Sequence, residues 1–256
     1  MEILNELKRD NLKNLLAQGK RLDDRGFFEY RHIEVQKNVV PNAEGSALAH
    51  IGKTQVLCGV KFDIAKPFPD RPAEGVLSTG AELAPLAFSE FEPGPPSNES
   101  IELARVVDRG IRSANIIDLK SFYLEPEKVL AIYVDLYVID HGGNLIDTAA
   151  LAAMAALNET KMPKIEEGKI IRGEYAGKLP LKGQVVTCTF AKLDSSFLLD
   201  PVLDEEKSMD ARITFATTPE HMCAAQKGGW GAFTKKDIME LIDKSFEAGA
   251  KLRELV

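Results

Sequence analysis

The sequence contains few of the residues that define disulfide-rich proteins and metal proteins. Its 256 residues include only three cysteines, Cys58, Cys188 and Cys223, which are far apart in the chain. Each lies in an apolar, strand-like run, so we predict small buried side chains in a reducing compartment, and hence a cytoplasmic protein. The four histidines show no spacing typical of metal ligands. We therefore expect neither a metal ion nor another cofactor.

Long apolar segments and an excess of positive charge are also missing. No uninterrupted apolar run approaches about 18 residues, and the first residues are charged, so we expect neither a transmembrane helix nor a signal peptide. The formal net charge is −7, which excludes a uniformly basic surface for nucleic acid. A hydrophobic content of 45% and a charged content of 28% are ordinary for a globular chain with a substantial core.

Against this acidic background, three arginines recur at helical spacing. Arg105, Arg109 and Arg112 are separated by four and then three positions, so a helix places all three on one face. The apolar residues between them make the opposite face: Val106, Val107 and Ile111. Such a stripe can hold a phosphate backbone, so we expect any contact with RNA or another polyanion to be local.

The alternative is an ordinary solvated helix face with ion pairs along the helix. In that case Glu102 pairs with Arg105, and Asp108 pairs with Arg112. Spacing alone favours this alternative, because charged stripes are common on exposed helices.

The pattern of apolar residues predicts an α+β protein made of two related β-α-β halves, with helices packed on mixed sheets. We predict helices over residues 3–17, 102–112 and 147–157 and from residue 234 onward. We predict strands over residues 32–39, 45–51, 54–62, 129–139, 184–192, 195–199, 211–217 and 221–227. The hairpins at 45–62 and 211–227 look like counterparts, which favours an internal duplication.

Turn and cap residues mark several of these boundaries. Gly52-Lys53 supplies a two-residue turn for the first hairpin. Ser97 or Asn98 can cap the arginine helix. Thr234, with Asp237 three residues later, predicts a capping box at the start of the last helix.

Two further segments are candidate chemical motifs. The loop His141-Gly-Gly-Asn144 joins a predicted buried strand to a helix, where glycine N–H groups can face an anion. The loop offers no arginine, lysine or serine, and Asp147 would repel an anion, so we favour a structural turn. The second segment concentrates carboxylates that either hold Mg²⁺ and perform acid–base chemistry or form an ordinary acidic loop, which we favour. These carboxylates are Asp200, Asp204, Glu205 and Glu206.

In this order, the segments resemble the RNase PH family of phosphorolytic exoribonuclease domains. The resemblance rests on Arg21-Leu-Asp-Asp-Arg-Gly26, Tyr30-Arg31, residues 45–58, 102–112 and 140–144, Leu199-Asp200-Pro with the following acids, and Ala225-Gln-Lys-Gly228. In detail the chain is most similar to the non-catalytic RNase PH-type subunit of the archaeal exosome. The resemblance implies an N-terminal helical extension over residues 1–20 and a single RNase PH-like domain over residues 21–256.

The departures from the family pattern predict that the chain is not an enzyme by itself. Active members follow the central strand with Asp-Gly-Gly and then with an arginine and a hydroxyl residue that bind the attacking phosphate. Here the arginine is absent, the spacing is longer and an aspartate stands in the segment. The resemblance thus implies that the following positions form a degenerate active site: Gly142, Gly143, Asn144, Asp200 and Glu206. The alternative is an active phosphorolytic or metal-dependent exoribonuclease that uses Asp200 and Glu206.

The resemblance also implies partners. Inactive subunits of this type pair with an active RNase PH-type subunit, and three such heterodimers close a six-membered ring that degrades single-stranded RNA from its 3′ end, with RNA-binding cap subunits and no membrane. Arg112 is the leading candidate for RNA contact, and Arg109 and Arg105 come next. Arg71, in the Pro-rich loop 66–72, is a further candidate. A purely structural scaffold without RNA contact is a third possibility.

Overall fold

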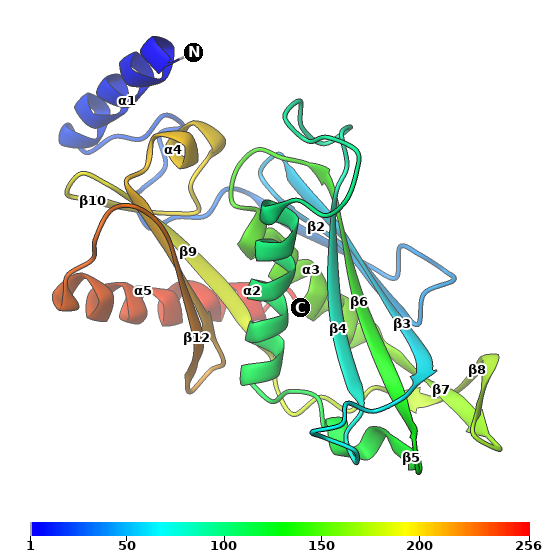
Figure 1. The fold of residues 1–256 in the computed structure, drawn as a ribbon. Coiled ribbons are helices and arrows are strands. Elements are labelled where there is room, and N and C mark those ends of the chain that lie inside the picture. The colour runs from blue at the N-terminus through cyan, green and yellow to red at the C-terminus, as the bar shows by residue number, and fades with distance from the viewer. Residues whose placement is uncertain (1) are drawn as a thin grey trace.

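Two β-sheets with helices packed against them form the framework of the protein (Figure 1). A computed structural model describes the backbone of residues 2–256 and the side chains of residues 8–256. The prediction of an α+β protein with helices packed on sheets is confirmed. No helix within this range is long and apolar enough to cross a membrane.

The first sheet has six strands and lies on the right of Figure 1. Its order is β1 (Ile33–Lys37), β2 (Gly45–Ile51), β3 (Thr54–Ala65), β6 (Lys128–Asp140) and β4 (Val76–Leu83), and β5 (Tyr123–Glu125) pairs with β6. β4 and β6 run parallel, whereas the other neighbours are antiparallel, so this sheet is mixed. The predicted two-residue turn is confirmed, because Ile51 lies opposite Thr54 in the hairpin register.

The second sheet is antiparallel throughout. Its order is β10 (Ser196–Leu199), β9 (Val186–Leu193), β11 (Ala211–Thr217) and β12 (Met222–Gly229). A separate hairpin of β7 (Lys161–Glu166) and β8 (Lys169–Lys178) protrudes beyond the first sheet in Figure 1. The sequence pattern predicts neither β4 nor this hairpin, because their side chains show no clear alternation between buried and exposed.

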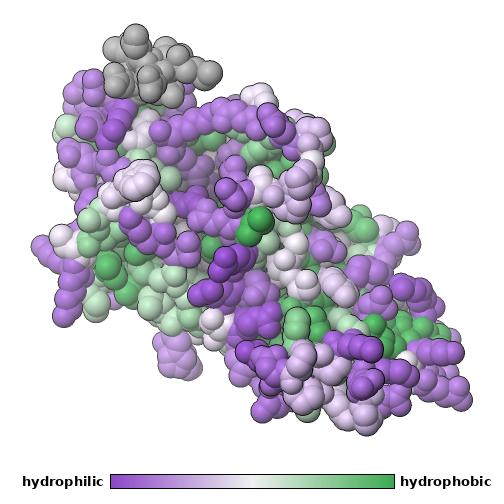
Figure 2. All heavy atoms as spheres, viewed as in Figure 1, coloured by the Kyte–Doolittle hydropathy of each residue, from purple (hydrophilic) through white to green (hydrophobic). Residues whose placement is uncertain are grey.

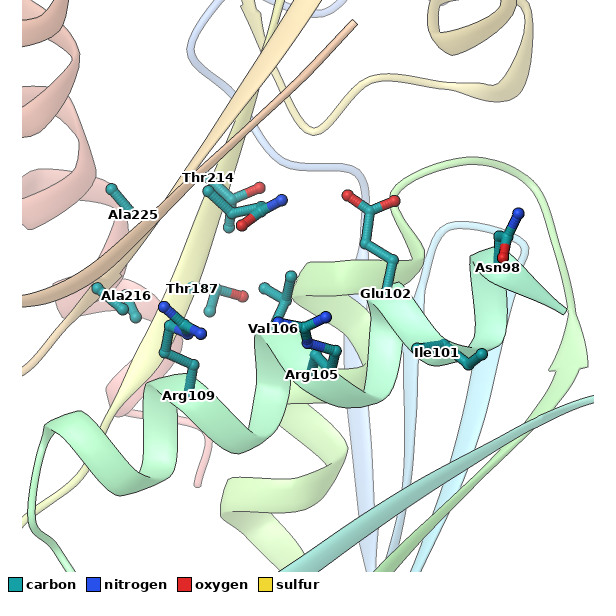
Figure 3. Close-up of a pocket in the computed structure, with 12 residues that line it drawn as sticks. Asn98, Ile101, Glu102, Arg105, Val106, Arg109, Thr187, Thr214, Ala216 and Ala225 are labelled. Carbon is teal, nitrogen blue, oxygen red and sulfur yellow. The ribbon is translucent and has the colours of Figure 1, made fainter. Parts of the chain in front are cut away.

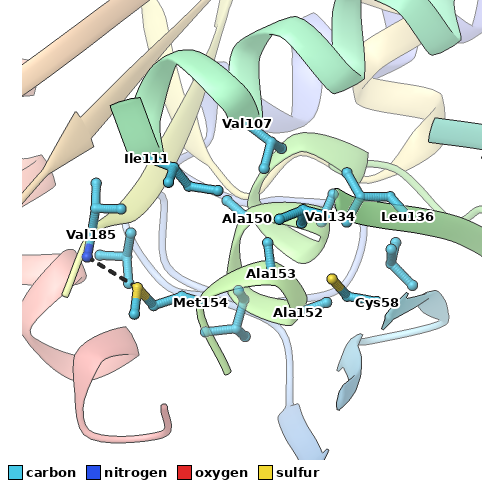
Figure 4. Packing of buried hydrophobic residues seen from close by; sticks show 14 of the residues in the cluster. Cys58, Val107, Ile111, Val134, Leu136, Ala150, Ala152, Ala153, Met154 and Val185 are labelled. Atoms are coloured by element: carbon cyan, nitrogen blue, oxygen red, sulfur yellow. Dashed lines mark hydrogen bonds between the residues drawn. The ribbon is translucent and has the colours of Figure 1, made fainter. Parts of the chain in front are cut away.

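The central helix α3 (Leu145–Glu159) is buried on all sides and joins the two halves of the molecule. Its run of alanines, together with Met154, lets it lie close to β2, β3 and β9. Figure 4 shows Ala150, Ala152 and Ala153 of α3 packed among apolar side chains from the first sheet and from α2. Such a uniformly apolar helix is stable only when neighbours cover every face. The main core is therefore shared by both sheets.

Two longer helices lie at the surface of this core. α2 (Asn98–Ser113) packs against β4, α3 and β12, and α5 (Lys235–Arg253) packs against β9 and β11. The predicted capping box of α5 is confirmed: the Asp237 N–H donates to Thr234 Oγ1 at 3.2 Å, and the Thr234 N–H donates to Asp237 Oδ2 at 3.0 Å. Two shorter helical segments complete the fold, η1 (Leu119–Phe122) and α4 (Leu203–Ser208).

The N-terminal helix α1 (Glu2–Ala17) packs on α4 at the upper left of Figure 1. Leu12 and Leu16 are buried in a small second cluster with Leu198 of β10. The helix predicted over residues 3–17 is thus confirmed. Ile3, Leu4 and Leu7 recur at helical spacing near the start of this helix, and their side chains lie outside the described residues.

The cysteine prediction is right for two side chains and wrong for the third. Cys58 and Cys188 are buried, but Cys223 is half-exposed. Cys223 belongs to β12, which is the edge strand of the second sheet and alternates between exposed and partly covered positions. The local sequence around Cys223 does not reveal that position in the sheet.

Candidate functional site

Helix α2 presents its three arginines on one exposed side, as the spacing predicts. Arg105, Arg109 and Arg112 are all exposed, and Figure 2 shows strongly hydrophilic side chains gathered along this helix. The helix is capped by Ser97, which accepts from the Ser100 N–H at 3.2 Å. Apolar residues of the opposite face anchor the helix to the core: Leu103, Val107 and Ile111.

The ion pairs expected of an ordinary helix face are only half present. The Arg112 guanidinium lies 3.1 Å from the Asp108 carboxylate and also donates to the Leu77 carbonyl at 3.0 Å. Glu102, however, pairs with Arg212 of β11 at 2.7 Å rather than with Arg105. Within residues 8–256, neither Arg105 nor Arg109 forms an ion pair, so both guanidinium groups are available to an external anion.

A cavity of about 340 Å³ separates this part of α2 from the second sheet. Arg105 and Arg109 form the helical wall, and Thr187, Thr214 and Ala216 contribute to the floor (Figure 3). Thr187 and Ala216 are direct neighbours across β9 and β11. The short side chains of the floor leave room for a ligand beside two cations.

The structure places Arg71 at the opposite end of the helix. Arg71 and Arg112 line a different cavity, of about 380 Å³, at the C-terminal end of α2. Of the four arginines predicted to bind RNA, Arg105 and Arg109 thus line the cavity against the second sheet, and Arg71 and Arg112 line the cavity at the C-terminal end of α2.

The backbone N–H groups of the loop between β6 and α3 donate to other side chains of this protein. The Gly142 N–H donates to Thr54 Oγ1 at 3.1 Å, and the Asn144 N–H donates to Glu206 Oε1 at 2.9 Å. Gly143 has φ of +100°, and a Cβ there would lie 2.5 Å from the Leu203 nitrogen. These donors are not free for an external anion, which favours the predicted structural turn over an anion site.

Asp147, in the first turn of α3, is fully buried and saturated with hydrogen bonds. It accepts from Tyr30 Oη, Asn144 Nδ2 and Thr187 Oγ1, each at 2.9 Å. Thr189 donates to it through both its N–H and its hydroxyl. Burial raises the pKa of Asp147 to about 6, although these hydrogen bonds act in the opposite direction. The carboxylate thus ties α3 to β9 beneath the cavity floor.

Asp200 is held by cations of this chain. It is fully buried, and Arg31 Nη2 lies 2.7 Å from Oδ1 while Arg25 Nη1 lies 3.0 Å from Oδ2. Asn144 Nδ2 donates to the same carboxylate at 2.8 Å. Arg31 also donates to the carbonyls of the 142–143 turn. Asp200 therefore fastens the turn and the N-terminal segment together.

The other carboxylates of this segment do not converge on one point. Glu205 forms a buried pair with Arg21 at 2.6 Å, whereas Asp204 pairs with Lys8 at the surface. Glu206 accepts from the loop instead, and burial raises its pKa to about 7. Within the described residues, no group of three His, Cys, Asp or Glu side chains is arranged to hold a metal ion.

The predicted acidic loop is in fact helix α4, so that prediction is wrong. The Val202 N–H donates to Glu205 Oε2 at 2.9 Å at the start of this helix. Acidic residues in a first helical turn also interact favourably with the helix dipole. A run of six residues is too short for its helical periodicity to be evident in the sequence.

Three further arginines form the charged centre around Asp200 and Glu205. In the sequence, only the family resemblance draws attention to them. Arg21, Arg25 and Arg31 lie in an irregular segment before β1, and they reach Glu205 and Asp200 from there. The sequence offers one signal for these residues, namely that three arginines occur within so short a segment. Their partners are about 170 to 185 positions away in the chain, so spacing cannot reveal the pairs.

Comparison with protein families gives matches over both halves of the chain. The model described as "3′ exoribonuclease family, domain 1" (RNase PH) matches residues 29–163, and that described as "3′ exoribonuclease family, domain 2" matches residues 183–248. Exosome complex component Rrp42 of Thermococcus kodakarensis is 45% identical, and the alignment covers 100% of this chain and 96% of the relative. The protein of the same name from Methanothermobacter thermautotrophicus is 41% identical, with 99% and 96% covered.

Solved structures agree with these matches. A chain of the Archaeoglobus fulgidus exosome with RNA bound to the active site superimposes with a TM-score of 0.90 and 41% identity, covering 98% of each chain. A chain of an archaeal exosome core gives a TM-score of 0.87 and 39% identity, covering 98% of this chain and 97% of that one. Rice Rrp46, at 20% identity and a TM-score of 0.70, covers 91% of this chain and 97% of its own and shares the fold.

Proposed function

The chain belongs to the RNase PH family of 3′ exoribonucleases, and on this premise we propose that it is an exosome subunit that binds RNA without performing phosphorolysis itself. The observation that carries the proposal is the combination of two arginines that form no ion pair within residues 8–256 and line an open cavity, and a turn whose donors are already used. The first feature supports a contact with RNA. The second argues against a phosphate-activating centre.

The RNA contact is assigned to Arg105 and Arg109 ahead of Arg112. The first two guanidinium groups have no carboxylate partner within residues 8–256, whereas Arg112 is engaged by Asp108 and the Leu77 carbonyl. A guanidinium group binds a phosphate through two parallel hydrogen bonds, which suits a backbone contact that does not depend on sequence. The order expected from the sequence is therefore revised in favour of Arg105 and Arg109.

The proposal of an inactive chain follows from the chemistry of phosphorolysis. The reaction needs inorganic phosphate held in line with the scissile bond, with the repulsion between the two anions neutralised. Here the buried carboxylate of Asp147 and the half-buried carboxylate of Glu206 both accept from Asn144 of the turn, where their charge opposes an anion, and Asp200 already neutralises Arg31. This arrangement gives little support to the alternative in which Asp200 and Glu206 form an active centre.

The catalytic groups must then come from another chain. We propose that the partner is an active RNase PH-type subunit, that three such heterodimers form a six-membered ring in the cytoplasm, and that RNA-binding cap subunits deliver single-stranded RNA. The similarity to chains of two solved archaeal exosomes supports this assembly. A ring also explains how a chain of net charge −7 handles RNA, because only the surface that meets the RNA must be positive.

The test is a phosphate-dependent RNA decay assay on the chain alone and on the chain reconstituted with the active subunit. We expect no decay from the chain alone and decay from the complex. The Arg105→Ala, Arg109→Ala double variant should lower the RNA affinity of the complex about a hundredfold or more, because each of the two lost charge-assisted contacts costs about 1.5–3 kcal/mol. Arg172→Ala, on the exposed hairpin strand β8, is the matched control.

Decay by the isolated chain would overturn the non-catalytic assignment. Equal RNA affinity for the double variant and the control would overturn the RNA contact and leave a scaffold role. Native mass of the mixed subunits reports assembly separately, so a failure to assemble cannot be mistaken for a failure to bind RNA.

A further inference from the structure

We propose that the arginines of α2 are the first part of a longer phosphate track, which ends at a second anion-binding cavity formed by Arg71, Lys120 and Lys182. This inference rests on the proposed function, since it assigns a further segment of the same bound RNA to this second cavity. It adds a binding site and two lysines that neither the sequence pattern nor the comparisons indicate.

The continuity of three cavities along α2 supports the track. Arg105 and Arg109 line the cavity against the second sheet and also a neighbouring cavity of about 410 Å³ on the other side of the helix. Arg112 lines that neighbouring cavity and also the cavity of about 380 Å³ at the C-terminal end of α2. Each cavity thus shares at least one lining arginine with the next cavity along α2.

The last cavity is locally basic in an acidic protein. Four cations line it, Arg71, Arg112, Lys120 and Lys182, against two carboxylates, Glu74 and Asp118. A single-stranded nucleic acid is typically bound in such a positively charged groove that follows its backbone.

The existing ion pairs of this cavity are easily exchanged for a phosphate. Lys182 lies 3.5 Å from Asp118, and Arg71 lies 3.6 Å from Asp70, and all four side chains are about half exposed or more. Exposed pairs of this kind contribute little stability. Lys120 forms no ion pair within the part of the chain with described side chains. The cations can therefore turn to an incoming anion at low cost.

The length of the track fits several nucleotides. Arg105 and Arg112 are seven positions apart on the helix, which is about 10 Å along its axis at ~1.5 Å per residue. A stacked strand rises about 3.4 Å per nucleotide, so this interval alone corresponds to about three nucleotides. Lys120 and Lys182 lie beyond Arg112 and extend the contact further along the strand.

The loop that carries Arg71 also offers an aromatic ring. Phe68 is 56% exposed, and its carbonyl accepts from the Arg71 N–H at 2.9 Å, so one turn presents both side chains. Exposed aromatic rings stack on unpaired bases irrespective of sequence. A cation and a ring in one turn therefore suit single-stranded RNA better than a free phosphate ion.

The experiment measures RNA affinity as the RNA is shortened one nucleotide at a time from its 5′ end. It uses the complex with the active subunit and omits inorganic phosphate, so that no decay occurs. Three forms are compared: the unaltered chain, Lys120→Ala with Lys182→Ala, and the control Lys235→Ala with Lys236→Ala on exposed positions of α5.

For the unaltered chain and the control, affinity should fall in a step of about tenfold when the RNA no longer reaches the terminal cavity. The Lys120 and Lys182 variant should bind long RNA about tenfold more weakly and show no such step. Its dependence on salt should also weaken, by about 0.7 in the logarithmic slope for each lost phosphate contact.

Identical length profiles for all three forms would overturn the track. If the lysine variant changed subunit assembly but not RNA affinity, the cavity would serve a protein contact and the inference would again fail. The proposed function is tested separately by the Arg105→Ala, Arg109→Ala double variant, so its failure can be distinguished from the failure of this inference.

Discussion

The guanidinium group of Arg31 and the carboxylate of Asp200 form an ion pair at 2.7 Å, although 169 positions separate them in the chain. The same guanidinium donates to the carbonyls of Gly142 at 2.9 Å and Gly143 at 3.0 Å. One pair thus joins the N-terminal segment, the turn before α3 and the segment before α4. Its role in this chain is to hold three segments together at the place where the family pattern expects a phosphate site.

Removal of Asp200 should therefore act on stability. Asp200→Ala leaves Arg31 without its carboxylate partner in a largely buried region, whereas Arg25 keeps its pair with Asp23. Breaking a buried pair costs about 3–5 kcal/mol. We expect the free energy of unfolding from urea titration to fall by this amount. Asp204→Ala, which removes only the exposed pair with Lys8, should cost less than about 1 kcal/mol. Similar losses for both variants would contradict the structural role of Asp200.

The half-buried carboxyl of Glu206 should make stability depend on pH. Its pKa is raised to about 7, against about 4.3 in an unfolded chain, so the folded protein holds the proton more tightly. The resulting stabilisation is fully present below about pH 4.3 and is lost as the pH rises through about 7. Glu206→Gln, which mimics the protonated form, should flatten this dependence. Unfolding at several pH values measures it, and an unchanged slope in the variant would refute the assignment.

Asp108 should restrain RNA binding by engaging Arg112. Asp108→Ala frees the guanidinium and removes a negative charge from the track, so RNA affinity should rise severalfold at low salt and less at high salt. Arg112→Ala should weaken binding less than Arg109→Ala, because Arg112 is already paired. Titration of labelled RNA at two salt concentrations measures both effects. Weaker binding by Asp108→Ala would show that the pair positions Arg112 for RNA.

Gly143 should tolerate no side chain. Its φ of +100° is unfavourable for other residues, and a Cβ would lie 2.5 Å from the Pro201 carbonyl. We expect Gly143→Ala to lower the free energy of unfolding by more than about 2 kcal/mol. Gly183→Ala is the control, because no atom lies within 4 Å of its Cβ position. Equal melting temperatures for the two variants would count against this account of the turn.

The sequence predicts those features that depend on local periodicity and on residues near each other in the chain. The arginine face of α2, the cap at Ser97, the hairpin turn at Gly52 and the capping box at Thr234 all follow from spacings of a few residues. Short or exposed elements such as α4 and β8 lack a sufficient pattern. The local sequence predicts a buried Cys223, whereas the side chain is half-exposed, because an edge strand is defined by the sheet and not by its own residues.

The order of residues thus predicts the class of fold, the family resemblance and a basic helix face in an acidic chain. Which of these charges are free depends on the folded arrangement. Glu102 pairs with Arg212 on another element, so Arg105 forms no ion pair among the described side chains, while Asp108 pairs with Arg112. The folded arrangement also decides that the donors of the 142–144 turn are used internally. The physical reason is that charges and hydrogen-bond donors are satisfied by whichever groups lie nearest in space, and chain separation does not encode that distance.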